Sequence, residues 1–249
     1  MVSYSVIIPA YNEEALLPQT LEALGNSMRT IDVAGEVIVV DNNSSDGTAR
    51  LAAEWGAAIV FEPHNQISRA RNAGLSAARG KYLIFLDADT NVSPEILAEA
   101  IGNLDDGGCC GGGSVLQFDL STSKAQSAVD LWNWISVKFG LAAGSFVYCL
   151  REGFEAVGGF SERVYAGEEI WFSRDLKAWG RQRSLDFRIL RGTPVVTSGR
   201  KLEWHSTTSL ILQAGFLLIF PVGTRFRTFC GNSYKRPEGR EKEKSERRK

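Results

Sequence analysis

Short apolar runs alternate with amphipathic segments through the first hundred residues of the chain. The apolar runs predict buried strands, and the segments between them, rich in Ala, Leu, Arg and Glu, predict helices. The strands are expected over 4–9, 36–40, 57–61 and 82–86, and the helices over 15–28, 48–55 and 68–79. Strands that alternate with helices in this order predict an α/β fold, with a parallel sheet and helices on its faces.

The pattern becomes less regular after about residue 105. It predicts a strand ending near Phe118, a helix over 124–139, a strand over 145–150, and a helix over 168–179 that Gly180 closes. The glycine-rich run 107–114 has no lysine, which argues against a phosphate-binding P-loop and favours a flexible turn before the strand. The second half therefore suits a substrate-facing lobe on the same sheet.

Polar residues follow several of the predicted strands. Tyr11, Asp41 and Asp87 each lie just past a strand end. Because right-handed crossovers bring the carboxyl ends of parallel strands to one edge, these residues should gather along one ligand-binding crevice. Asp87 and Asp89 lie two residues apart after the strongly apolar run 82–86, so their carboxylates can share one hard divalent cation. Such a cation can bind the diphosphate of a nucleotide.

Composition limits the partners of the chain. The 249 residues are 44% hydrophobic and 23% charged, which is ordinary for a globular protein. The net charge of −1 supplies no overall field that would attract nucleic acid. The four cysteines have neither CxxC nor zinc-ligand spacing, so a reducing compartment is expected. The N-terminal residues show no signal-peptide pattern.

The C-terminal part of the chain has a different character. Residues 235–249 contain eight basic and four acidic residues and almost no apolar ones, so this tail is expected to be disordered. It is either a solvated tail or a contact for anionic lipid. Residues 210–222 are mostly apolar but too short to span a bilayer, and a buried helix and an interfacial helix remain open as interpretations.

Four segments, taken together and in order, resemble the family 2 glycosyltransferases of the GT-A fold. They are SVIIPAYNEE at 5–14, VIVVDNNSSDGT at 37–48, RARNAG at 69–74 and DAD at 87–89. The resemblance covers most of residues 3–92, with a weaker echo at 158–180. It implies a Rossmann-like, mostly parallel central sheet flanked by helices, with an acceptor-binding C-terminal lobe. It also implies a nucleoside-diphosphate sugar as donor and inversion at the anomeric carbon.

The resemblance assigns the nucleoside to the ends of the first two strands. Pro9, Ala10, Tyr11 and Glu13 match positions that hold the base, and Asp41 matches the acid that reads the base or the ribose. A carboxylate suits that role because it accepts protons from a base imide or a ribose hydroxyl. The alternatives are structural: Asp41 caps a turn, and Glu13 complements a helix dipole.

The same resemblance assigns the diphosphate and its cation. Arg71 lies in a segment that commonly contacts the nucleotide, although it also fits a solvated helix position. Asp87 matches the acid near the ribose and the metal, and Asp89 the acid that ligates Mn²⁺ or Mg²⁺. Some relatives add a late histidine as a ligand, and His205 is the candidate here, with a core or surface histidine equally open.

The catalytic base is expected in the second half. The segments GGFSE at 158–162 and AGEEIWF at 166–172 resemble the family segment that ends in Glu-Asp before a helix. Glu169 matches the acidic position where the family usually has Asp, and Glu168 supports it. An inverting transfer needs a carboxylate that takes the acceptor hydroxyl proton. The alternative is that both glutamates only complement a helix dipole.

These observations predict a metal-dependent inverting glycosyltransferase that moves a sugar from a UDP- or GDP-sugar to a glycan, lipid or small-molecule acceptor. Residues 1–105 would bind the nucleotide sugar, 106–232 the acceptor, and 233–249 would form the tail. We expect a cytoplasmic protein with no nucleic-acid partner and with peripheral contact to the inner face of the membrane through 210–249. The alternatives are a nucleotidyltransferase that makes an activated sugar and a non-catalytic nucleotide-sugar-binding module.

Overall fold

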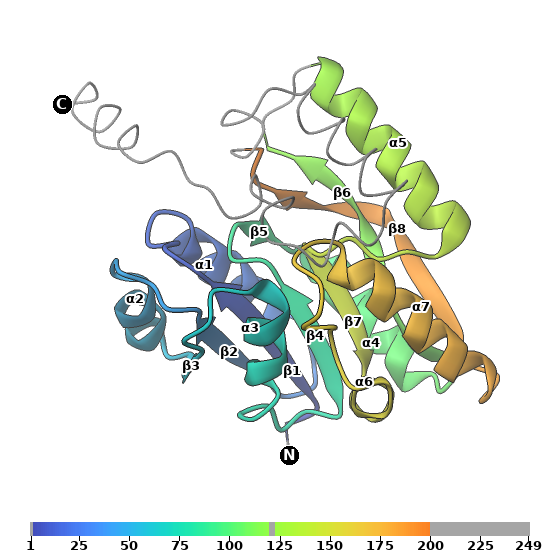
Figure 1. Cartoon of the computed structure of the whole chain (residues 1–249), viewed down its shortest axis with the longest axis horizontal. Helices are drawn as coiled ribbons and strands as arrows, with labels where there is room; N and C mark the ends of the chain where they lie inside the picture. The colour runs from blue at the N-terminus through green and yellow to red at the C-terminus, as the bar shows by residue number, and fades with distance from the viewer. Residues whose placement is uncertain (1, 120–122, 200–249) are drawn as a thin grey trace.

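The computed structural model describes residues 2–119 and 123–199, which form one mixed sheet with helices on both faces (Figure 1). The strands are β1 (Tyr4–Ala10), β2 (Gly35–Asp41), β3 (Ala58–Phe61), β4 (Tyr82–Leu86), β5 (Thr90–Asn91), β6 (Cys109–Phe118), β7 (Phe146–Leu150) and β8 (Asp186–Thr197). The helices are α1 (Leu17–Met28), α2 (Thr48–Trp55), α3 (Ile67–Gly74), α4 (Pro94–Asp105), α5 (Ser123–Phe139), α6 (Arg151–Val157) and α7 (Glu168–Arg181).

The sheet has the strand order β3-β2-β1-β4-β7-β6-β8-β5. The four strands of the first half run parallel, whereas β7 is antiparallel to both β4 and β6, and β6 pairs with β8 in parallel. The predicted α/β class with a mostly parallel sheet and flanking helices is confirmed. Parallel pairing of β2, β1 and β4 places their carboxyl ends at one edge of the sheet.

Side chains of β1 alternate between two cores. Val6 and Ile8 point into a core that also contains Leu21 of α1, whereas Ile7 points into a second core with Ala70 of α3. The first core also contains side chains of α2 and α4, and the second contains side chains of α6 and α7. Because both faces of the central strands are covered, these strands are apolar at most positions, which explains why their sequence signal is strong.

The glycine-rich run is not the flexible turn that the sequence predicts. Gly111, Gly112 and Gly113 belong to β6, a buried strand. A side chain at Gly112 would bring its Cβ within 1.7 Å of the Arg188 carbonyl oxygen, and one at Gly113 within 2.7 Å of the Ala142 Cβ. The glycines are therefore explained by close packing within the sheet, a contact that distant segments create and local sequence does not reveal.

Two helix ends also differ from the prediction. Helix α3 ends at Gly74, and the chain continues through i→i−3 turns in which the Leu75 and Ser76 amides donate to the Asn72 and Ala73 carbonyls. Gly180 does not close α7, which continues to Arg181. A Cβ at Gly180 would lie 2.6 Å from the Cys110 sulfur, so this glycine permits close helix–strand packing.

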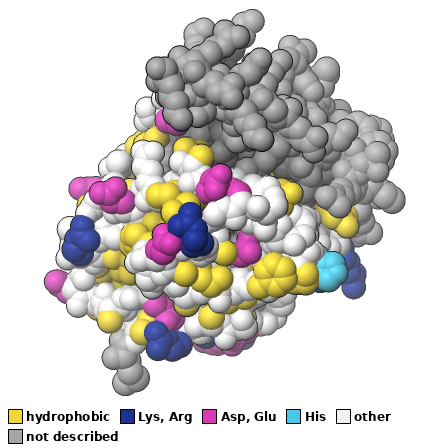
Figure 2. All heavy atoms as spheres, turned by 90° about the vertical axis from the view of Figure 1, so that its left-hand side faces the viewer, with side chains coloured by type: hydrophobic (Ala, Val, Ile, Leu, Met, Phe, Trp, Pro, Cys, Tyr) yellow, Lys and Arg dark blue, Asp and Glu magenta, His cyan; other side chains and the backbone are white. Residues whose placement is uncertain are grey.

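Strand β3 forms one edge of the sheet and exposes hydrophobic side chains. Ile59 and Phe61 of β3 and Trp55 of α2 are exposed. Figure 2 looks onto this side of the molecule, where hydrophobic side chains of the described residues are interspersed with acidic and basic ones. Among the described residues, none of the helices combines the length and apolar character needed to cross a membrane. His205, the 210–222 segment and the 233–249 tail lie outside the described residues.

Candidate active site

Two loops at the carboxyl ends of β1 and β2 are bound to each other. The backbone amide of Asn42 donates to the Ala10 carbonyl at 2.8 Å. The side-chain oxygen of Asn12 accepts from the backbone amide of Ser45 at 2.8 Å. Asn12 has a positive φ of 51°, a conformation that Asn tolerates better than most residues. These bonds fix the loop that carries Tyr11 against the loop that follows Asp41.

The acid and the aromatic residue that the sequence assigns to the nucleoside lie at this edge. Ala10, the last residue of β1, pairs in register with Asp41, so Tyr11 directly follows that pairing and is 39% exposed. Asp41 is 8% exposed, and one of its carboxylate oxygens accepts the Ser44 amide at 3.0 Å. Asp41 therefore does cap a turn, and its contact with the nucleoside stays a prediction.

Pro9 and Glu13 take supporting positions in the same region. Pro9 is a buried residue of β1. The Glu13 amide donates to the Thr48 hydroxyl at 2.8 Å, and its carbonyl accepts from the Leu17 amide at the start of α1. Glu13 is 8% exposed and precedes α1, whose first turn contains no acidic residue, so these backbone bonds do not test the helix-dipole alternative, and a contact with the base stays a prediction.

Asp87 and Asp89 lie in the turn that joins β4 to β5. The Asp87 carbonyl accepts from the Thr90 amide at 3.1 Å, and the Asp87 amide donates to the Ser145 carbonyl at 3.2 Å. The Asp87 carboxylate accepts from Arg71 at 3.0 Å. Asp89 instead lines a hollow on the side of α1. The turn thus directs one acid toward α3 and leaves the other at the crevice.

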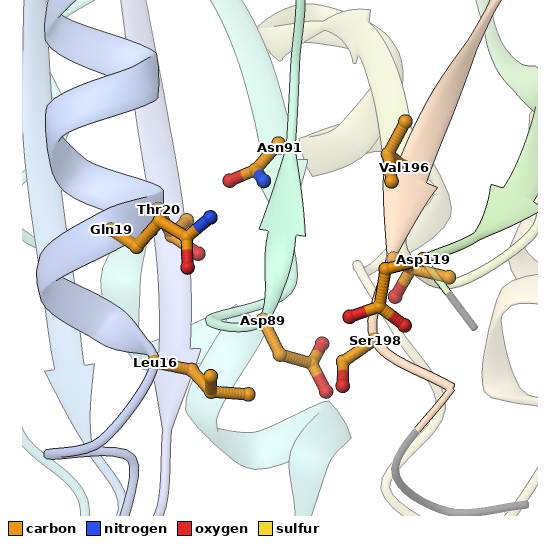
Figure 3. A pocket seen from close by; sticks show the side chains of 9 residues that line it. Leu16, Gln19, Thr20, Asp89, Asn91, Asp119, Val196 and Ser198 are labelled. Carbon is orange, nitrogen blue, oxygen red and sulfur yellow. The ribbon is translucent and has the colours of Figure 1, made fainter.

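The hollow beside Asp89 is bounded by α1, by the β4–β5 turn and by the ends of β6 and β8 (Figure 3). Asp119, at the end of β6, also lines it, and one of its carboxylate oxygens accepts the Gly199 amide at 2.7 Å. The Ser198 amide donates to the Asp89 carbonyl at 3.0 Å. Sequence reasoning missed Asp119, because only the pairing of β6 with β8 brings it beside Asp89.

The oxygen ligands at this edge fit a hard divalent cation. Mg²⁺ in nucleotide sites is commonly held by one or two carboxylates together with phosphate oxygens and water. Asp89 and the second oxygen of Asp87 would supply that number of protein ligands if both faced one cation, which the opposite directions of the two side chains here do not show. Among the described residues, no cluster of three or more His, Cys, Asp or Glu side chains could hold a metal by itself. Such a site would therefore depend on the diphosphate of the donor.

Arg71 is the central residue of a buried ion cluster. Its side chain is 1% exposed and donates to Glu168 at 2.6 Å, to Asp87 at 3.0 Å and to the Gly144 carbonyl at 2.8 Å. Its guanidinium also lies over the Phe160 ring, 5.1 Å from the centroid. Burial lowers the pKa of Arg71, but the charges of Asp87 and Glu168 raise it above the usual value, so the cation is held firmly.

Arg71 is therefore buried and bonded to Asp87. The alternative of a solvated helix position is wrong, because Arg71 is buried, and the nucleotide contact stays a prediction. The guanidinium joins Asp87, which the sequence assigns to the donor, to Glu168, which precedes the assigned base. Residues far apart in the chain are thus held within one hydrogen-bonded unit.

Glu169 is a partly buried carboxylate at the beginning of α7. Burial raises the pKa of Glu169 to about 8, the negative charge of Glu168 adds to the rise, and Arg71 opposes it. A carboxylate with a pKa near working pH is well suited to accept a proton from a hydroxyl group. Glu168 is 4% exposed and engaged with Arg71, so it supports the cluster, and Glu169 is the better candidate for the base.

The model of the glycosyl transferase family 2 matches residues 5–144 of this chain. An uncharacterized glycosyltransferase of Mycobacterium tuberculosis is 33% identical over 133 residues, which cover 53% of this chain and 53% of that protein. The undecaprenyl-phosphate 4-deoxy-4-formamido-L-arabinose transferase of Proteus mirabilis is 30% identical over 135 residues, covering 51% of this chain and 38% of that protein. The chain thus spans about half the length, or less, of these curated relatives.

Solved structures show the same fold. The mannosyltransferase of Pyrobaculum calidifontis, in complex with GDP-Man and Mn²⁺, has a TM-score of 0.65 at 22% identity and covers 88% of this chain and 64% of its own. Glucosyl-3-phosphoglycerate synthase of Mycobacterium tuberculosis, in complex with Mn²⁺, UDP and glucosyl-3-phosphoglycerate, has a TM-score of 0.61 at 21% identity. It covers 92% of this chain and 80% of its own. These likenesses confirm the expected GT-A type of α/β fold.

Proposed function

Because the chain belongs to glycosyl transferase family 2, an enzyme family, we propose that it transfers a sugar from a nucleoside-diphosphate sugar to an acceptor hydroxyl, with inversion. The relatives described with GDP-Man or with UDP support this class of donor. We further propose that 1–105 binds the donor and 106–232 the acceptor. The proposed boundary falls at the end of α4, although both halves build one sheet.

The ion cluster around Arg71 is the observation that carries this proposal. Its guanidinium bonds both Asp87, at the end of a parallel strand, and Glu168, at the beginning of α7. Open α/β sheets bind ligands at the carboxyl ends of their strands, so the donor would lie beside Asp87. Glu169 is then the carboxylate next to the donor that can act as base on an incoming hydroxyl.

In the proposed reaction, Asp41 and Tyr11 hold the nucleoside, and Asp89 and Asp87 would hold Mn²⁺ or Mg²⁺ beside the diphosphate. The cation would neutralise the charge that develops on the leaving diphosphate. Glu169 takes the proton of the acceptor hydroxyl while that oxygen attacks the anomeric carbon. The bond from the anomeric carbon to the diphosphate oxygen breaks, and the nucleoside diphosphate leaves with both electrons of that bond.

A thermal-shift panel of UDP- and GDP-sugars, each with and without Mn²⁺ or Mg²⁺, tests the donor assignment. We expect one donor to stabilise the folded chain only when metal is present, by about 2.7 kcal/mol at a ligand concentration one hundred times the dissociation constant. Asp89→Asn should lose this stabilisation. The matched control Asp130→Asn, an exposed change on α5, should retain it. A full donor shift in Asp89→Asn would remove that residue from the metal site.

Product analysis with two substrate sets, a nucleotide sugar with acceptor and a nucleoside triphosphate with a sugar phosphate, separates the alternative enzyme class. A transferase releases a nucleoside diphosphate and leaves the sugar on the acceptor. A nucleotidyltransferase would instead release pyrophosphate from a nucleoside triphosphate and a sugar phosphate. Release of pyrophosphate alone would overturn the proposed transfer.

We propose that a lipid carries the acceptor hydroxyl and that the chain makes peripheral contact with the inner face of the membrane. The Proteus mirabilis relative, which is named for a polyprenyl phosphate, supports the lipid but not the hydroxyl. The outer surface of α5 exposes Leu131, Trp134 and Phe139, each by more than half. The Lys138 ammonium lies 4.4 Å from the Trp134 ring centroid. Apolar side chains with a nearby cation are typical of interfacial helices, and the net +4 charge of 235–249 would add attraction to anionic lipid.

Vesicle co-sedimentation tests the membrane contact. The double substitution Leu131→Ser and Trp134→Ser is expected to lower partition onto phosphatidylglycerol vesicles at least ~10-fold, since each inserted side chain contributes ~1.5–3 kcal/mol. The control is Phe61→Ser on β3, which also removes an exposed hydrophobic side chain and should leave partition unchanged. Equal partition of the double variant and the wild-type chain would exclude α5 as the contact.

A further inference from the structure

The segment that leads into the proposed base has glycines at both ends. It runs from Gly158 to Gly167, between α6 and α7, and Glu168 and Glu169 follow directly. Gly158, Gly159 and Gly167 all have positive φ angles, of 78°, 71° and 70°. Glycine adopts this conformation without the steric penalty of other residues and gives the chain little local stiffness. The position of the base must therefore be fixed by contacts from outside the segment.

Asn72 of α3 supplies two of these contacts. Its side-chain nitrogen donates to the Phe160 carbonyl at 2.9 Å, and its side-chain oxygen accepts from the Phe160 amide at 2.9 Å. The amide group thus pairs with the backbone as a neighbouring β-strand would. A Cβ at Gly159 would lie 2.7 Å from the Asn72 oxygen, so the fit at this point admits only glycine.

Gln66, the residue directly before α3, supplies two further contacts with this segment. Its side-chain nitrogen donates to the carbonyls of Glu162 and Val164, at 2.9 Å each. Gln66 is 5% exposed, so these bonds are shielded from water. Together, Gln66 and Asn72 hold three backbone positions of the segment through four hydrogen bonds.

The same helix is tied to the donor side of the site. The backbone amide of Gln66 donates to the Asn42 side-chain oxygen at 3.0 Å, and the backbone amide of Asn42 donates to the Ala10 carbonyl at 2.8 Å. Asn42 directly follows Asp41. Amide side chains therefore connect the strand ends proposed to hold the nucleoside with the segment that ends at Glu169.

We propose that Gln66 and Asn72 are positioning residues that set the location of Glu169 relative to the donor. The inference rests on the proposed function, because it takes Glu169 as the base. A displacement of the base by about 1 Å costs about 100-fold in rate. The four hydrogen bonds from Gln66 and Asn72 to the 158–167 segment, here called the clamp, therefore control catalysis without touching substrate. Donor affinity depends on other residues and should be unaffected.

Asn72→Ala removes one half of the clamp, and Gln66→Glu removes the other without changing side-chain size. Both are expected to lower kcat ~10–100-fold and to leave the donor KM within about twofold. In Asn72→Ala, which adds no charge, the pH midpoint of transfer should fall, because water would reach a displaced Glu169 whose pKa is raised mainly by burial. Amide hydrogen exchange across 160–169 should accelerate in the free protein.

Asn133→Ala is a matched control. Asn133 of α5 bonds both the amide and the carbonyl of Leu116, at 3.0 and 2.9 Å, in the same two-bond arrangement as Asn72 with Phe160. Each alanine variant loses a two-bond pairing with the backbone, about 2 kcal/mol in unfolding by urea. Asn72→Ala also loses a bond to the exposed Glu162 carboxylate at 3.2 Å. Asn133→Ala should leave kcat and the pH midpoint as in the wild-type chain, although its stability falls equally.

The measurements separate the possible failures. If Asn72→Ala and Gln66→Glu lose stability but keep kcat and the pH midpoint, the residues are only structural and the inference is wrong. If Asn72→Ala does not fold, Gln66→Glu carries the same test. If the wild-type chain transfers no sugar from any donor, the proposed function fails. Hydrogen exchange across 160–169 still shows whether the clamp exists, and unchanged exchange in both variants would overturn it.

Discussion

Replacing Glu169 by Gln is expected to lower the rate of sugar transfer by ~10²–10⁴-fold, the usual contribution of a general base. Gln has nearly the same shape as Glu but cannot accept the hydroxyl proton. Donor binding should persist, because the acids proposed for the donor are untouched. Initial rates of nucleoside diphosphate release, with metal and saturating donor, measure the loss. Glu155→Gln, an exposed change on α6, is the control and should transfer at the wild-type rate.

The same substitution should stabilise the fold at high pH. Burial raises the pKa of Glu169 to about 8, above its value in the unfolded chain, so ionisation costs stability as pH rises between those two values. The neutral amide of the Glu169→Gln variant would carry no such cost. Because the side chain keeps some contact with water, we expect a gain on the order of 2 kcal/mol above pH 8, and none near pH 4. Transfer at the wild-type rate by Glu169→Gln would remove Glu169 from the mechanism.

The raised pKa also predicts how the wild-type enzyme responds to pH. A base must be deprotonated, and the pKa of about 8 keeps much of Glu169 protonated at neutral pH in the free protein. At low donor and acceptor concentrations, the transfer rate should therefore rise with pH and level off above about 8. A rate that is already constant from pH 6 would contradict this assignment.

The parts of this molecule that the sequence predicts are those whose signal is local. Strands β1, β2 and β4 are covered on both faces, so each is a mostly apolar run, and the runs lead to Tyr11, Asp41 and Asp87. Asp41 and Asp87 could be placed at one edge because parallel strands align their ends. The N-cap of α4 is similarly local, with Ser93 accepting the Ile96 amide.

The parts that the sequence does not predict depend on contacts between distant segments. The alternation of apolar and charged residues in α3 fits a helix with a solvated side, yet Arg71 is buried because Glu168 and Asp87 neutralise its charge. Asn72 occurs in a recognisable motif, but its pairing with Phe160 requires the second half of the chain to lie over α3. Asp119 has no local signal, because the pairing of β6 with β8 brings it to the site.

Replacing Arg71 by Met is expected to destabilise the fold by ~3–5 kcal/mol, because a buried ion pair is broken and its acids are left without compensation. Glu168 is 4% exposed, so water cannot replace the lost bond at 2.6 Å. Urea unfolding near pH 7 measures the change. Arg50→Met is the matched control: it breaks the exposed pair with Glu54, and such surface pairs contribute less than about 1 kcal/mol.

The loss of Arg71 should also change catalysis in a direction that a general weakening of the fold does not predict. Arg71 opposes the rise in the pKa of Glu169, so without it that pKa should lie above about 8 and the pH profile of transfer should move upward. Loss of the Asn72 contacts is expected to move the profile downward, since water then reaches the carboxylate. Opposite shifts in these two variants would show that charge and burial act separately on the base. Shifts of the same sign would contradict the roles given to Arg71 and Asn72.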